Sequence, residues 1–327
     1  MNDHYSYFDE REYLELNPDV AMAVMAGYFS SGWEHYQRFG KIEGRLFSKS
    51  FSREKAIFHL IDKNGVGLEI GPSHSPLAPK RKGYKVHIVD YLSADELREK
   101  YQEQPGVNID NIEEVDYVWK GGPLEELIGK TDYYDYIIAS HVIEHIPNPI
   151  LFLQSCLRLL KPTGVLSLAI PDKRFCFDHF LPVTTTGMWL DAYFQNRKEP
   201  TPGQTFDYFA NKSKRFGSIA WFYDKRGGAD SLIYSMETAK QKWEEACSAI
   251  GEYTDVHCWR FTPTSFRLLL NDLNYLGLLN FEILAEFNTF AFEFYLSLGR
   301  QKNPYSQAKN NDRLSLLQTA LSESTIK

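Results

Sequence analysis

Histidine and acidic side chains that could move a proton gather in three segments of the sequence. A histidine titrates near neutral pH and can take a proton from a hydroxyl group, while a carboxylate can do the same or orient the histidine. The segments are "SHVIEHIPNP", "PDKRFCFD" and "DVHCWRFTP". The candidates that they contain are His141, Glu144, His145, Asp172, Lys173, Arg174, Asp178 and His257. We predict His141, Asp172 and His257 as the catalytic candidates among them.

Each of these segments also has a structural interpretation. His141 could instead cap the following helix, and His145 could pack to fix its loop. Arg174 could hold an acidic or sugar acceptor by paired hydrogen bonds, with Asp178 beside it, or both could belong to a solvated charged loop. Trp259 could present an aromatic platform to a substrate or lie in the core. We predict Arg174, Asp178 and Trp259 as substrate-binding residues.

The spacing of His141, Glu144 and His145 is similar to that of a zinc motif, but we predict no metal site. A zinc-binding pair of this kind needs both histidines on one helical face, whereas this segment leaves a strand and soon reaches Pro147. The four cysteines show neither a C-x-x-C pair nor another metal-ligand spacing, which indicates reduced thiols in a cytoplasmic protein.

The stretch "VGLEIGPSHSP" at residues 66–76 joins a short apolar run to a glycine turn. Gly71 would let the backbone approach a ligand closely, but the stretch lacks the glycines of a dinucleotide-binding turn. Asp90 lies 21 residues after Glu69, close to the spacing at which a second-strand carboxylate takes ribose hydroxyls. Asp116 follows a third apolar run. These strand ends favour a ribose-bearing ligand without a pyrophosphate.

The elements that must position these residues alternate between strands and helices. Apolar runs predict strands at "VGLEI", "KVHIVD", "IEEVD", "YDYIIAS" and "VLSLAI", and helical spacing predicts a crossover helix at 150–160. Thr262 and Pro263 begin a second helix that Gly277 ends. The segments "FEILAEF" and "FAFEFYLSL" that follow are predicted to be two strands of a hairpin that turns around Asn288-Thr289. The fold expected is an α/β, Rossmann-like, mostly parallel seven-stranded sheet with a C-terminal antiparallel hairpin.

Three further regions flank or interrupt this sheet. Residues 1–50 predict a small helical unit, because short helical stretches alternate with glycines. Residues 51–300 form the main domain, with an aromatic-rich helical cap inserted at about 173–259 that is too long for a simple loop. Residues 301–327 predict a loose tail with a short helix near "LSLLQTAL".

The motifs of the main domain resemble those of class I S-adenosylmethionine-dependent methyltransferases. The resemblance covers residues 56–172 and rests on "LEIGPSHSP", "IVDYLS", "VDY", "YDYIIASHVIEHIPNP" and "LLKPTGVLSLAIPDKRF". It implies S-adenosylmethionine as the cofactor. The cofactor-binding residues implied, from the methionine part through the ribose and adenine to the methyl group, are Glu69, Gly71, Pro72, Ser73, Asp90, Tyr91, Asp116, Tyr117 and Ser140.

Two further resemblances suggest a biological context. "EIGPSHSP", "SHVIEH" and "IPDKRF" resemble a bacterial subgroup associated with surface-polysaccharide genes. Asn17–Val20, His35-Tyr36 and Gly40–Arg45 resemble a unit found in many bacterial cell-surface glycan and glycosyltransferase proteins. The expected function is therefore O-methylation of a sugar hydroxyl. A small metabolite, amine or lipid acceptor, or a non-catalytic glycan-assembly role, stays open.

Composition limits the partners and the location. The formal net charge of −7 offers no general attraction to a phosphate backbone, so we expect no nucleic-acid partner. The acidic amino terminus lacks the basic and apolar regions of a signal peptide, and no apolar stretch approaches the roughly 20 residues of a membrane span. We expect a cytoplasmic enzyme with a small-molecule or glycan acceptor, and glycan-assembly partners for residues 1–50.

Overall fold

A seven-stranded sheet forms the centre of the protein. The computed structural model describes residues 8–48, 51–222, 229–248, 253–301 and 310–324. The strand order is β3-β2-β1-β4-β5-β9-β8, parallel except where β9 pairs antiparallel with β5 and β8. The strands are β1 Val66–Ile70, β2 Lys85–Asp90, β3 Tyr117–Val118, β4 Tyr134–Ser140, β5 Leu160–Pro171, β8 Phe281–Phe290 and β9 Glu293–Arg300. The predicted fold class is confirmed.

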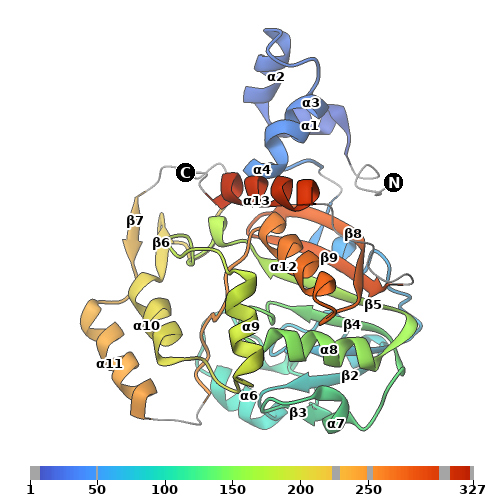
Figure 1. Cartoon of the computed structure of the whole chain (residues 1–327), viewed down its shortest axis with the longest axis vertical. Helices are drawn as coiled ribbons and strands as arrows, with labels where there is room; N and C mark the ends of the chain where they lie inside the picture. The colour runs from blue at the N-terminus through green and yellow to red at the C-terminus, as the bar shows by residue number, and fades with distance from the viewer. Residues whose placement is uncertain (1–7, 49–50, 223–228, 249–252, 302–309, 325–327) are drawn as a thin grey trace.

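The two faces of the sheet are buried by different elements. Along β4, Ile137 and Ala139 join a core with α7, α8, α9 and α12, whereas Tyr136 and Ile138 face α5 and the N-terminal helices. This alternation follows from the two-residue period of a strand. Figure 1 shows α8, α9 and α12 in front of the sheet. These helices are α5 Arg53–Ile57, α7 Leu124–Ile128, α8 Pro149–Leu159, α9 Thr186–Phe194 and α12 Pro263–Tyr275.

The predicted helix at Thr262 is confirmed as α12, with its start fixed by local chemistry. The Thr262 hydroxyl accepts from the amide of Ser265, and the Ser265 hydroxyl accepts from the amide of Thr262. Pro263 occupies the first turn, where its missing N–H costs nothing. The start of α6, Ala94–Tyr101, is held by a similar exchange between Ser93 and Glu96.

The N-terminal helices stand at one end of the molecule and share a core with the sheet (Figure 1). Residues from the resembling pattern hold this unit together. Nδ2 of the Asn17 side chain donates to the carbonyl oxygens of Tyr13 and Leu46, at 2.8 Å each, and His35 Nδ1 lies 2.9 Å from the Tyr13 hydroxyl oxygen in a hydrogen bond. Arg45 pairs with Asp19 at 2.7 Å. The helices are α1 Glu10–Leu16, α2 Pro18–Met25, α3 Gly32–His35 and α4 Lys41–Glu43.

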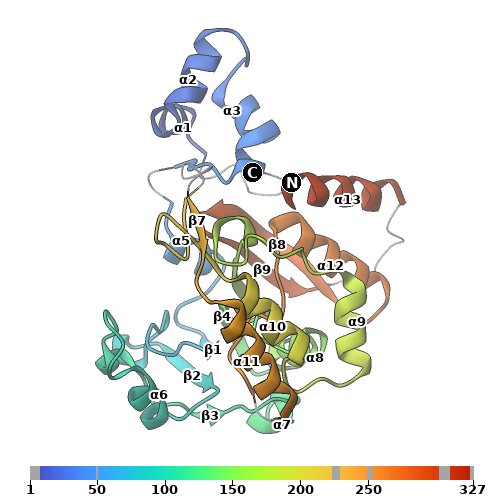
Figure 2. The same cartoon turned by 90° about the vertical axis from the view of Figure 1, so that its left-hand side faces the viewer.

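The predicted cap divides into two parts. Trp189 of α9 is fully buried in the main core, so α9 belongs to the layer of helices on the sheet. Helices α10 and α11 pack together beside that layer, as Figure 2 shows. Strands β6 and β7 form a separate two-stranded sheet (Figure 1). These elements are α10 Pro202–Asn211, β6 Ser213–Arg215, β7 Asp230–Leu232 and α11 Met236–Ser248.

Two local predictions were wrong, and a third element is longer than expected. The strand expected at 112–116 lies instead at β3, because Ile112 and Val115 pack against α6 rather than entering the sheet. The hairpin turn falls at Ala291 and Phe292, since Thr289 is held in β8 by a 2.5 Å hydrogen bond from its hydroxyl to Asp172. In the predicted tail, the helix expected near "LSLLQTAL" is present and longer than expected, as α13 Asn310–Ser324, and its Glu323 accepts from Thr264 of α12.

No helix in the described residues combines the length and the apolar composition that crossing a bilayer requires.

Candidate active site

A cavity of about 440 Å³ opens where β1, β2 and β4 end. Ligands of open α/β sheets bind at this edge, beside the point where strand order reverses. Tyr253 and Asp255, which precede α12, and Lys198, from the loop after α9, form its outer wall. The predicted site residues that line it are Gly71, Ser73, Asp90, Tyr91 and His141.

The turn after β1 has a backbone that only special residues adopt easily. Gly71 has a φ of 64°, and its amide donates to the carbonyl oxygen of Val89 at 2.8 Å. Ser73 has a φ of 50°, and its amide donates to a carboxylate oxygen of Asp90 at 2.9 Å. The buried hydroxyl of Ser73 has no hydrogen-bond partner among the described residues. An unsatisfied polar atom at a cavity wall is suited to a ligand.

Glu69 does not line the cavity. Its carboxylate is buried and accepts hydrogen bonds from the amides of Leu77 (2.7 Å) and Ala78 (3.0 Å). Desolvation raises the pKa of Glu69 to about 7, against the opposing effect of these two hydrogen bonds. Pro72 is likewise absent from the wall, and its carbonyl accepts from Ser75. Glu69 therefore fixes the course of the loop after β1.

Asp90 and Tyr91 form the wall at the end of β2. Besides Ser73, the Asp90 carboxylate accepts from the amide of Tyr91 at 2.7 Å, and burial raises its pKa despite these contacts. The Tyr91 ring lies 4.5 Å from that of Tyr253, and the ammonium of Lys120 sits 3.6 Å from its centroid. This part of the cavity presents one carboxylate and two aromatic rings in tilted contact.

Asp116 and Tyr117, predicted at the adenine, lie outside the cavity wall. The Asp116 carboxylate pairs with Lys80 at 2.6 Å and accepts from the amide of Ile88. The wall is formed instead by the three residues after β3, Trp119, Lys120 and Gly121. Strand β3 begins later in the sequence than the apolar pattern indicated, so the residues that follow its carboxyl end also lie later in the sequence. Trp119, an aromatic residue directly after this later strand end, was the sequence signal that could have located this part of the wall.

His141 belongs to a charged group that assembles distant parts of the chain. Its Nε2 lies 2.7 Å from a Glu293 oxygen on β9, and Arg53 of α5 donates to the other oxygen at 2.8 Å. Burial opposes ionisation of Glu293, but His141, Arg53 and Tyr295 together outweigh it and lower the pKa of that carboxyl. Arg53 also donates to the Ser140 hydroxyl, so Ser140 lies behind the wall. Sequence reasoning did not find Arg53 or Glu293.

Asp172 and Arg174 are buried away from the cavity. Arg174 Nε donates to the two Asp172 oxygens at 2.9 and 3.1 Å, and the carbonyl oxygen of Ile42 accepts from Arg174 Nη1. Thr289 supplies a further donor to Asp172. The structure thus gives both residues a role in joining the N-terminal unit, β5 and β8, and neither is aimed at the cavity.

His257, Asp178 and Trp259 also lie in the interior. His257 Nδ1 contacts Asp178 at 2.5 Å, while the Trp259 indole donates to the carbonyl oxygen of Ile146 at 2.6 Å. Burial opposes ionisation of Asp178, but His257 and the neighbouring Arg260 lower its pKa overall. None of the three lines the cavity, and Trp259 belongs to the main core.

The comparisons with known proteins define the class. A methyltransferase domain model matches residues 39–276, so the chain belongs to this family. The family match confirms the predicted class, an S-adenosylmethionine-dependent methyltransferase. A search of curated proteins found no match.

Three solved structures show distant similarity to this chain. A putative zinc-dependent alcohol dehydrogenase from Rhodobacter sphaeroides has a TM-score of 0.39 at 12% identity, over 76% of this chain and 88% of that chain. A putative S-adenosylmethionine-dependent methyltransferase from Listeria monocytogenes has a TM-score of 0.37 at 14% identity, over 76% and 100%. A DhpI–SAH complex has a TM-score of 0.36 at 11% identity, over 90% and 100%.

Proposed function

We propose that the cavity binds S-adenosylmethionine and that the enzyme transfers its methyl group to a hydroxyl oxygen. The residues present fit this cofactor. Asp90 offers a carboxylate for the ribose hydroxyls, and Gly71 and Ser73, whose hydroxyl is unpartnered among the described residues, line the same cavity. Tyr91 and Trp119 offer aromatic surface for the adenine. When bound, the cofactor supplies an electrophilic methyl group on a sulfonium.

His141 is the proposed base for the acceptor hydroxyl. This role rests on one observation, the His141–Glu293 contact at the wall of the cavity. An ionised carboxylate only accepts hydrogen bonds, so Glu293 holds a proton on Nε2 and leaves Nδ1 as the basic nitrogen. Glu293 then stabilises the imidazolium that forms when Nδ1 takes the hydroxyl proton. Alignment of the acceptor by the cavity wall supplies the remaining rate enhancement.

The proposed acceptor is a sugar hydroxyl of a bacterial surface glycan or of its precursor, modified in the cytoplasm. The motif resemblances in the main domain and in residues 1–50 support this choice. The outer wall supports it as well, because Tyr253 and Asp255 combine an aromatic ring with a hydrogen-bond acceptor. Glycan-assembly proteins are the proposed partners of the N-terminal unit. A small metabolite, amine or lipid acceptor is the competing proposal.

Titration calorimetry tests the cofactor site. The protein should bind S-adenosylmethionine and its demethylated product but not NAD. Asp90→Ala should weaken binding by about 10- to 100-fold, because a hydrogen bond to a charged group contributes about 1.5–3 kcal/mol. Asp95→Ala, at an exposed carboxylate, is the matched control. Unchanged affinity in a folded Asp90 variant would refute this placement of the ribose.

An acceptor screen with a labelled methyl donor tests the reaction. Glycans and nucleotide sugars should accept label, while a preference for amines or lipids would favour the competing acceptor. His141→Gln should lower kcat by about 100- to 10,000-fold, the usual contribution of a positioned base, with cofactor affinity nearly unchanged. A His141 variant with full kcat would remove this residue from the mechanism.

A further inference from the structure

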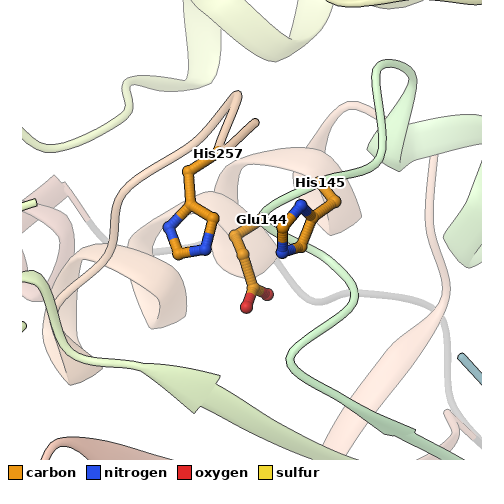
Figure 3. A group of neighbouring side chains, drawn as sticks. All are labelled: Glu144, His145 and His257. Atoms are coloured by element: carbon orange, nitrogen blue, oxygen red, sulfur yellow. The ribbon is translucent and has the colours of Figure 1, made fainter. Parts of the chain in front are cut away.

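A second cluster lies behind the cavity wall and is built from Glu144, His145 and His257. One ligand-capable atom from each side chain lies within 4.8 Å of the others. In Figure 3 the Glu144 carboxyl group and a ring nitrogen of each histidine face a common space. Glu144 and His145 come from the turn after β4, and His257 comes from the segment that precedes α12.

Glu144 is the feature that requires explanation. Its side chain is fully buried, yet neither carboxylate oxygen has a hydrogen-bond partner among the described residues. Nδ1 of His141 lies 3.6 Å away, beyond hydrogen-bond range, and the His141 proton is engaged by Glu293 on the other nitrogen. Burial of a carboxylate without a partner is costly, and a bound cation offsets that cost.

The two histidines are arranged as metal ligands are. His257 Nδ1 contacts the buried Asp178 at 2.5 Å, which leaves its Nε2 available. His145 Nδ1 lies 3.0 Å from a carboxylate oxygen of Asp255, in a geometry that forms no hydrogen bond, and its Nε2 is available as well. For His257, the Asp178 carboxylate on the outer nitrogen is the kind of contact that fixes the tautomer and the ring orientation of metal-bound histidines.

We propose that Glu144, His145 and His257 bind one divalent transition-metal ion, with Zn²⁺ as the expected occupant. Two imidazole nitrogens and one carboxylate favour such an ion over Mg²⁺ or Ca²⁺, which prefer oxygen ligands. Ligand atoms held tetrahedrally at about 2.1 Å from a metal ion lie about 3.4 Å from one another. Side-chain rotations that bring the three atoms closer by up to about 1.4 Å, from their present separations within 4.8 Å, would complete the site.

The site differs from the zinc motif that was rejected from the sequence. His141 is excluded, because its φ of 54° directs the chain out of β4 and its Nε2 is held by Glu293. The third ligand, His257, lies 112 residues beyond His145 and no local motif contains it. Since His145 also lines the cofactor cavity, the ion would sit beside that cavity with an open coordination position. The proposal does not depend on the acceptor.

Metal analysis of the full chain tests the proposal. After treatment with a chelator and dialysis, the protein should bind one equivalent of Zn²⁺ by calorimetry and retain it through gel filtration. His257→Gln and Glu144→Gln should each weaken binding at least about 100-fold, and Asp178→Asn about 10- to 100-fold. His59→Gln, which alters a histidine packed on Phe287 far along the sheet, should bind like the wild type.

Co²⁺ in the wild-type protein provides a measurement that needs no variant. The expected result is a visible absorption of a four- or five-coordinate ion, which Zn²⁺ abolishes by displacement. Absence of stoichiometric binding in the folded wild type would overturn the proposal. So would equal affinity in the wild type and the His257 variant, since the ion would then occupy a different site.

Discussion

Replacement of Gly71 by alanine separates two costs at the turn after β1. The first cost is the left-handed backbone, since φ is 64° and a side chain there costs about 1–2 kcal/mol. The second is a collision, because an added Cβ would lie 2.9 Å from Cγ2 of Val142. Forcing an extra methyl into a packed site costs about 1–3 kcal/mol. Gly71→Ala should therefore lower the free energy of unfolding by about 2–5 kcal/mol.

Gly129→Ala is the matched control for the backbone cost. Gly129 ends α7 with a φ of 68°, and an added Cβ meets nothing within 4 Å. Urea unfolding should show a loss of about 1–2 kcal/mol for this variant. The difference between the two variants then measures the collision with Val142.

A double-mutant cycle with Val142→Ala completes the assay. If the collision is real, Gly71→Ala should cost less in the Val142→Ala background, with a coupling energy of about 1–3 kcal/mol. Equal losses for Gly71→Ala and Gly129→Ala, together with zero coupling, would refute the close approach of the turn to Val142.

Three further predictions concern stability. Glu69→Gln should flatten the pH dependence of the free energy of unfolding. The pKa of Glu69 is about 7 in the native protein and 4.5 in the unfolded chain, so the wild type should lose about 3 kcal/mol of this free energy as pH rises from 4.5 through 7. Urea unfolding across that pH range measures the difference between the two proteins. Arg174→Met leaves Asp172 buried without its cation and should cost about 3–5 kcal/mol, against less than about 1 kcal/mol for the exposed Arg11→Met. Thr262→Ala should lower the melting temperature by removing an N-cap that contributes about 1 kcal/mol.

Local sequence patterns predicted the elements whose signals are themselves local. The strands at Val66–Ile70, Lys85–Asp90 and Tyr134–Ser140 were placed to the residue, because apolar runs bounded by turn residues reflect burial on both faces. The third strand was misplaced because Ile112 has the same apolar character whether it packs in a sheet or beneath a helix. Periodicity alone does not distinguish these two environments.

The site was harder to predict because long-range pairing decides which side chains are free. Asp172 and Arg174 lie two residues apart in a charged segment, and only the tertiary structure shows that they neutralise each other in the interior. Glu293 lies inside an apolar hairpin and gave no local signal, yet it orients His141. The sequence indicated His257 as a chemically capable residue. It did not show that Glu144 and His145 lie beside His257 in the folded protein.

The placement of β9 has a consequence for how the enzyme matures during synthesis. Glu293 contacts His141, 152 residues earlier in the sequence, and Arg53, 240 residues earlier. These contacts can therefore form only after nearly the whole chain has been synthesised. Until then β5 is an unpaired edge, and long-range strand pairing is slow. In a nascent chain that ends before β9, His141 has no Glu293 carboxylate to orient it. We expect catalytic competence to be the last property that the growing chain acquires.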